Sequence, residues 1–140
     1  MTAFADSSVL VMRYLDEPGC SDVLGRRLLV VAGLARVDVV SAFWRRARSR
    51  ELTADEAGLL ADDFEADWQD PSGPYALTDI TAGVLEQAAR AVRVHGLRAY
   101  DAVQLACAMT ARGAAAEVDT FLCADRDLAD AARREGFATS

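Results

Sequence analysis

Four aspartates stand among hydrophobic residues, where an ionised side chain is costly to bury without a partner. They are Asp6, Asp38, Asp101 and Asp125. Carboxylates that converge repel one another, by about 4 kcal/mol for two charges 4 Å apart at an effective dielectric near 20. A site that gathers several of them must therefore take up protons or a cation. Carboxylate oxygens without His or Cys favour Mg²⁺ or Mn²⁺ over Zn²⁺.

Each of these aspartates also has an ordinary structural explanation. Asp6 and Asp125 are suited to cap the helices that follow them, and Asp101 suits the first turn of its helix. Asp38 is suited to an ion pair with Arg36. Taken singly, these explanations are at least as good as a functional one, and only the four positions together favour an acidic site.

The segments between the aspartates indicate which elements position them. An apolar start predicts a short buried strand within 3–12, which ends in a turn containing Asp6 and its neighbouring hydroxyls. Thr53 to Glu56 form a capping box, and Gly96 follows a helix as its C-cap. Helices are predicted at 9–15, 21–29, 34–50, 53–68, 81–95, 99–112 and 128–135, and further strands at 75–78, 118–124 and 136–138. This alternation predicts an α/β fold with a mainly parallel sheet flanked by helices.

The predicted sheet explains why distant aspartates would meet. Asp6 and Asp125 each follow a strand, and Asp101 begins a helix. The carboxyl ends of parallel strands face one crevice. We therefore expect these acids to share a site.

Composition limits the remaining chemistry. The 140 residues have the size of one domain, expected to span 1–140, and carry a net charge of −7. All 15 basic residues are arginines, which excludes a Walker A loop, Schiff-base catalysis and a Ser-Lys dyad. The net negative charge argues against general electrostatic binding of nucleic acid. Any reaction on nucleic acid therefore requires a local feature that overcomes this repulsion.

The sequence lacks the patterns typical of cysteine-based sites, signal peptides and membrane spans. Cys20, Cys107 and Cys123 form no CxxC pair, which argues against a zinc knuckle or a disulfide framework. The start of the chain does not resemble a signal peptide, and no apolar run approaches the ~18 residues of a membrane span. We therefore expect a cytoplasmic protein without a membrane partner.

Three sequence blocks together resemble PIN domains, in particular the VapC-type toxin ribonucleases of bacterial toxin–antitoxin pairs. The blocks are Asp6-Ser-Ser-Val-Leu-Val11, Leu97-Arg-Ala-Tyr-Asp-Ala-Val-Gln-Leu-Ala106 and the segment from Phe121 to Gly136. Each block alone is a weak motif, but their order and spacing cover nearly the whole chain. The resemblance implies a Rossmann-like parallel sheet and an acidic site with Mg²⁺ or Mn²⁺. It also implies endoribonuclease activity on RNA, a homodimer and a VapB-type antitoxin.

The resemblance assigns Asp6, Asp101 and Asp125 to the family's acidic positions. Asp38 stands where the family usually has Glu, one methylene longer, and Cys123 stands where a Thr or Ser is usual. All four aspartates are expected to be catalytic and to hold the metal.

Three further residues are possible auxiliaries: Ser7, Arg98 and Asp127. Asp127 is nearly as well explained as a solvated acid, and Ser7 as part of a turn. Arg98 is a candidate for contacting the RNA backbone or an acid. A basic patch of Arg45, Arg46, Arg48 and Arg50 is a candidate RNA guide, although a solvated helix face explains it better.

The departures at Asp38 and Cys123 leave two alternatives open. One is a PIN-fold binding module with weak or no nuclease activity. The other is a metal-dependent nuclease or phosphatase that acts on another substrate. His95 is expected to interact with a helix C-terminus rather than act as a base.

Overall fold

The computed structural model describes residues 2–15, 28–115 and 117–139, and in them five parallel strands form one sheet in the order β3-β2-β1-β4-β5. The strands are β1 (Thr2–Ala5), β2 (Leu29–Ala32), β3 (Tyr75–Thr78), β4 (Val118–Leu122) and β5 (Ala138–Thr139). The helices are α1 (Ser7–Tyr14), α3 (Ala35–Arg48), α4 (Ala54–Gln69), α5 (Ala82–His95), α6 (Ala99–Ala114) and α7 (Arg126–Arg134). The predicted α/β class with a parallel sheet flanked by helices is confirmed.

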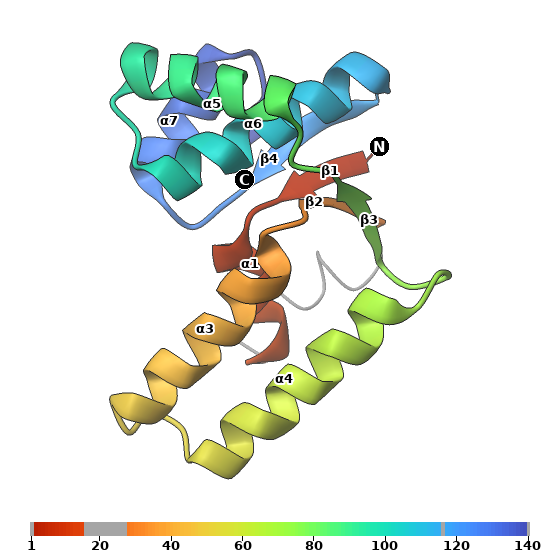
Figure 1. Cartoon of the computed structure of the whole chain (residues 1–140), viewed down its shortest axis with the longest axis vertical. Helices are drawn as coiled ribbons and strands as arrows, with labels where there is room; N and C mark the ends of the chain where they lie inside the picture. The colour runs from red at the N-terminus through yellow and green to blue at the C-terminus, as the bar shows by residue number, and fades with distance from the viewer. Residues whose placement is uncertain (1, 16–27, 116, 140) are drawn as a thin grey trace.

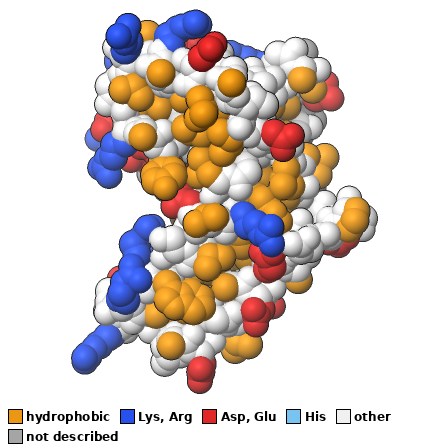
Figure 2. All heavy atoms as spheres, viewed as in Figure 1, with side chains coloured by type: hydrophobic (Ala, Val, Ile, Leu, Met, Phe, Trp, Pro, Cys, Tyr) orange, Lys and Arg blue, Asp and Glu red, His pale blue; other side chains and the backbone are white. Residues whose placement is uncertain are grey.

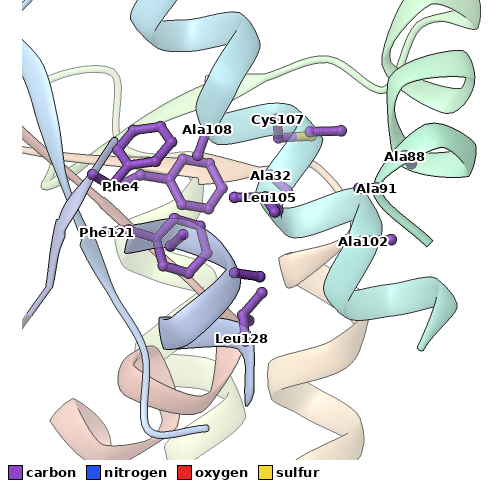
Figure 3. Close-up of a cluster of buried hydrophobic side chains, with 14 of the residues drawn as sticks. Phe4, Ala32, Ala88, Ala91, Ala102, Leu105, Cys107, Ala108, Phe121 and Leu128 are labelled. Atoms are coloured by element: carbon purple, nitrogen blue, oxygen red, sulfur yellow. The ribbon is translucent and has the colours of Figure 1, made fainter. Parts of the chain in front are cut away.

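Helices cover both faces of the sheet, with α5, α6 and α7 on one side and α1, α3 and α4 on the other (Figure 1). The alternation of side chains along β1 explains the two cores. Phe4 belongs to the core beneath α5, α6 and α7, whereas Ala3 and Ala5 belong to the opposite core. In the first core Phe4 stacks on Phe121 with ring centroids 5.3 Å apart, and Leu128 of α7 packs nearby (Figure 3).

An aromatic group fills the second core beneath the α3–α4 hairpin. Phe64 is fully buried and meets Tyr14 edge-on at 5.4 Å and Trp68 at 5.6 Å between ring centroids. The predicted capping box begins α4, since Glu56 N donates to Thr53 Oγ1 (3.1 Å) and Thr53 N donates to Glu56 Oε1 (2.9 Å). The α3–α4 hairpin extends away from the sheet (Figure 1).

Two predicted elements need correction. β1 ends at Ala5 and α1 already begins at Ser7, because Asp6 is the N-cap of this helix. The helix predicted over 21–29 is wrong at its end, since Leu29 begins β2; residues 21–27 lie outside the described residues. A four-residue apolar run can belong to a buried strand or a helix, and hydrophobic periodicity does not distinguish them. The position of β2 between β1 and β3 decides in favour of the strand.

The strand order determines where a site can form. The chain passes from β1 to β2 on one side, whereas β4 lies on the other side of β1. Such a reversal opens a crevice beyond the carboxyl ends of the two central strands. Among the described helices, none has the length and hydropathy that crossing a membrane requires.

Candidate active site

Asp6 lies at the carboxyl end of the central strand β1 and is almost completely buried, at 5% exposure. Its backbone N–H donates to the Leu122 carbonyl oxygen of β4 at 3.0 Å. Its Oδ1 accepts hydrogen bonds from Ser8 Oγ (2.6 Å) and from Val9 N (3.4 Å). Asp6 therefore does cap α1.

Ser8 connects this end of β1 to the loop after β4. Its hydroxyl donates to Asp6 and accepts from the backbone N–H of Ala124 at 3.0 Å. Asp125, the next residue, is the N-cap of α7 and accepts from Leu128 N at 2.9 Å. Asp125, like Asp6, is thus a helix cap at a strand end, as expected, and the capping explanation does not exclude a second role.

Asp101 and Asp38 reach the same place from helices on opposite faces of the sheet. Asp101 lies in the first turn of α6 and Asp38 in the first turn of α3, and both are half-buried. The Arg36 partner considered for Asp38 instead forms a two-pronged ion pair with Glu65 of α4. Asp38 is therefore not paired with Arg36, and it lines the crevice.

All four predicted aspartates line one cavity of about 200 Å³. The other side chains that line it are Ser7, Ser8, Val11, Ala42, Arg45, Arg98, Tyr100 and Gln104. Of the auxiliary residues, Ser7 and Arg98 thus lie in the cavity. Asp127 does not, but it lines a neighbouring cavity of about 210 Å³ together with Asp101 and Asp125.

The electrostatics of the cavity favour uptake of positive charge. Burial raises the pKa of Asp6 from 3.8 to about 6, against the hydrogen bonds from Ser8 and Val9, and the charge of Asp101 raises it further. Burial also raises the pKa of Asp101, as do the charges of Asp125 and Asp38, while Arg98 opposes them. These carboxylates are therefore destabilised when ionised, and a proton or cation would stabilise them.

The donor set fits a hydrated hard cation better than a fully protein-coordinated one. In the part of the chain that the structure describes, no three His, Cys, Asp or Glu side chains are already arranged to hold a metal ion. Mg²⁺ usually keeps several waters and needs only one or two carboxylates. A buried acceptor with no hydrogen-bond partner in the described residues, Gln104 Oε1, also belongs to a residue that lines this cavity. The carboxylates require positive charge, and the unpaired acceptor requires a hydrogen-bond donor. A hydrated cation supplies both.

Cys123, which stands in place of a hydroxyl residue, is not suited to bind an ion. Its Sγ donates to the Asp125 carbonyl oxygen at 3.4 Å. Burial and the nearby carboxylates raise the pKa of the thiol to about 12, so it stays protonated at neutral pH. Thiolate, not thiol, is the metal ligand.

Two residues of the site were missed in the sequence. Tyr100 is 66% exposed at the rim of the cavity, and Gln104 is 2% exposed at its wall. A signal for Gln104 is visible in retrospect, because it follows Asp101 by three positions and so shares its helix face. His95 instead lies in the last turn of α5, as predicted, where its Nε2 pairs with Glu135 Oε1 at 2.8 Å.

Comparison with known proteins agrees with this geometry. No family model matches the chain. The ribonuclease VapC45 of Mycobacterium tuberculosis (strain CDC 1551 / Oshkosh) is 35% identical over 91 residues, which are 65% of this chain. The match covers 56% of that relative, so the chain spans little more than half of its length.

Solved structures share the fold at low sequence identity. A toxin–antitoxin complex from Klebsiella pneumoniae superposes with a TM-score of 0.65 at 13% identity, covering 91% of this chain and 90% of that one. VapC20 of Mycobacterium tuberculosis, described as a sarcin–ricin-loop-cleaving toxin, superposes with a TM-score of 0.64 at 15% identity, covering 92% and 94%. The sequence blocks, the parallel sheet and these similarities agree: the chain resembles VapC ribonucleases in sequence and shares its fold with solved toxin–antitoxin proteins.

Proposed function

We propose that this protein is a Mg²⁺- or Mn²⁺-dependent endoribonuclease and the toxin of a VapBC-type pair. The observation that carries the proposal is the convergence of Asp6, Asp38, Asp101 and Asp125 on one cavity from four separate segments. The 35% identity to a VapC ribonuclease supports the same chemistry. We propose further that residues 1–140 act as one domain.

The resemblance to VapC-type proteins suggests how the four carboxylates divide the work. Asp6, Asp101 and Asp125 are the proposed main ligands, directly or through water, and Asp38 orients a water. A bound divalent ion supplies charge stabilisation of the phosphate and a more acidic water. A carboxylate with a pKa near 4 is a weak base on its own. Within the protein, Ser8 and the α1 N-terminus keep Asp6 in place through two hydrogen bonds.

The arginines around the cavity suit a single strand of RNA. The central cavity shares Ser8, Ala42 and Arg45 with a larger groove of about 690 Å³ between α1 and α3, which Arg46 also lines. On the other side, the central cavity shares Arg98 with the neighbouring cavity of about 210 Å³, which Arg134 also lines. Figure 2 shows the hollow between the two helical layers, with basic side chains along its edge. Cations on both sides of the acidic centre can hold the backbone despite the net charge of −7.

Cleavage assays with a divalent ion test the proposal. We expect labelled single-stranded RNA to be cut with Mn²⁺ or Mg²⁺ and not with EDTA. Asp6→Ala and Asp101→Ala should each abolish cutting, whereas Asp62→Ala, at an exposed site on α4, should not. Ion-dependent cutting that survives both cavity substitutions would rule out this site.

A PIN-fold binding module is the second candidate, because no three acidic side chains in the described residues form a ready-made ion site. Titration with Mn²⁺ separates the two functions. Binding at a hundredfold excess over Kd stabilises a protein by about 2.7 kcal/mol. A folded protein with no thermal shift and no cutting would favour the binding module. Cutting of DNA or small phosphoesters in preference to RNA would favour the other alternative substrates.

A VapC-type toxin implies protein partners as well as an RNA substrate. We propose a VapB-type antitoxin and a homodimer, acting in the cytoplasm where the RNA is. An exposed groove on α3 and α4, which Val37, Val40 and Trp44 line, is the surface we propose for such contacts. Light scattering of Val37→Asp against the unmodified protein tests the dimer, since a charge at a residue 73% exposed should disturb association without disturbing the fold.

A further inference from the structure

Gln104 presents a hydrogen-bonding problem that the proposed roles leave unsolved. It lies in the middle of the buried face of α6 and is 2% exposed. Its Nε2 donates to Ser7 Oγ at 3.0 Å, but Oε1 has no partner among the described residues. A buried polar atom without a partner is costly and calls for an explanation. An apolar residue would fit the surrounding alanine-rich helix at no such cost.

The surroundings of Gln104 limit what can pair with Oε1. Gln104 lies three positions after Asp101, and its hydrogen-bond partner Ser7 directly follows Asp6. Both aspartates and Gln104 line the same cavity. Ionised carboxylates accept hydrogen bonds and cannot donate them. Serine, arginine and tyrosine side chains also line this cavity, but none of those in the described residues donates to Oε1. A donor that enters the cavity can therefore fill this place.

We propose that Gln104 is a positioning residue whose Oε1 accepts a hydrogen bond from a water bound to a divalent cation in this cavity, while its amide N–H holds Ser7. This inference rests on the proposed metal-dependent function. A hydrated cation carries water donors outward to surrounding acceptors and satisfies the carboxylates at the same time. Through Ser7, the amide also ties the start of α1 to α6, and so the segment carrying Asp6 to the helix carrying Asp101. Gln104 thus orients the shell of water rather than the ion itself.

The test compares metal affinity with stability in the ion-free protein. Gln104→Met keeps the length of the side chain and good helix propensity but removes both polar atoms. Gln87→Met is the matched control, because Gln87 lies on α5 outside the cavity, where its Oε1 accepts from Thr110. Mn²⁺ affinity is measured by calorimetry and by the electron paramagnetic resonance of free Mn²⁺, and Tm is measured in EDTA.

We expect Gln104→Met to change Tm in EDTA only slightly, since removing the unpaired Oε1 offsets the loss of the hydrogen bond to Ser7. Its Kd for Mn²⁺ should rise about tenfold, whereas Gln87→Met should leave Kd unchanged. Gln104→Glu keeps an acceptor oxygen at the same position and should bind Mn²⁺ at least as tightly as the unmodified protein. This rescue would separate an acceptor role from a packing role.

Two other results have different meanings. If the unmodified protein binds Mn²⁺ and Gln104→Met binds it equally well, the inference about Gln104 is overturned while the proposed function stands. A lower Tm in EDTA with unchanged Kd leads to the same conclusion, because it shows a purely structural glutamine. If the unmodified protein does not bind Mn²⁺, the proposed metal-dependent function itself fails, and Gln104 has no metal-bound water to orient.

Discussion

Replacing Asp6 by asparagine measures the electrostatic cost of the acidic cavity. Asparagine is as good an N-cap as aspartate and still accepts from Ser8 Oγ and Val9 N. The substitution therefore removes the charge and preserves the local hydrogen bonds. Burial raises the pKa of Asp6 from 3.8 to about 6. The folded protein without a bound ion thus prefers the protonated carboxyl.

The size and sign of the effect follow from proton linkage. Below pH 3.8 the carboxyl is protonated in both the folded and the unfolded chain, so it does not affect stability. As the pH rises from 3.8 to about 6, the unfolded chain loses this proton and the folded chain keeps it, so stability falls. Each tenfold change in the acid constant corresponds to about 1.4 kcal/mol, so the loss above pH 6 is at most about 3 kcal/mol. Asp6→Asn should avoid this loss.

Urea unfolding in EDTA at pH values from 4 to 8 provides the measurement. The free energy of unfolding of Asp6→Asn should match that of the unmodified protein near pH 4 and exceed it by up to about 3 kcal/mol at pH 7 and above. Asp62→Asn, at an exposed position on α4, serves as the control and should show no such divergence. A variant that is equally stable or less stable at every pH would refute the reasoning, because Asp6 would then not be destabilised by its burial.

Three further predictions concern the capping box, the arginine rim and the aromatic core. Thr53→Ala removes the acceptor for Glu56 N and should lower the free energy of urea unfolding by about 1 kcal/mol without altering cleavage, whereas Thr53→Ser should retain the cap. Arg45→Gln, in the exposed rim, should weaken RNA binding and reduce the slope of log K against log salt by about 0.7; an unchanged slope would remove Arg45 from the phosphate path. Phe64→Ala empties a fully buried site and should cost about 3–5 kcal/mol in urea unfolding, and a loss below 1 kcal/mol would contradict the packing described.

Much of the fold follows from local signals. The capping box at Thr53, the helix from Thr81 to Gly96 and the strand beginning at Val118 were predicted because each depends on neighbouring residues. Strand β2 was not predicted, because four apolar residues have no distinctive local period. Their strand conformation comes from pairing with β1 and β3, which are distant in sequence.

The acidic site likewise combines features that are visible in the sequence with features that depend on distant contacts. The sequence alone determined the four aspartates, because an acid in an apolar run is visible without a structure. Their arrangement at one cavity was a prediction from the strand ends, and the tertiary structure places all four there. Arg36 was a plausible partner of Asp38, but α4 brings Glu65 to Arg36 instead. Ion pairs between helices depend on packing, which short sequence spacing does not reveal.

The amino-acid composition sets which chemical groups this protein can use, whereas the packing of the fold sets which of them are buried and unsatisfied. Without lysine, and with its single histidine engaged with Glu135, the chain is left with carboxylates and arginines for phosphate chemistry. The unpaired oxygen of Gln104 was invisible in the sequence, because glutamine is ordinary on a solvated helix face. It becomes significant only when the sheet, α1 and α6 enclose it, since burial removes the water that would otherwise satisfy it.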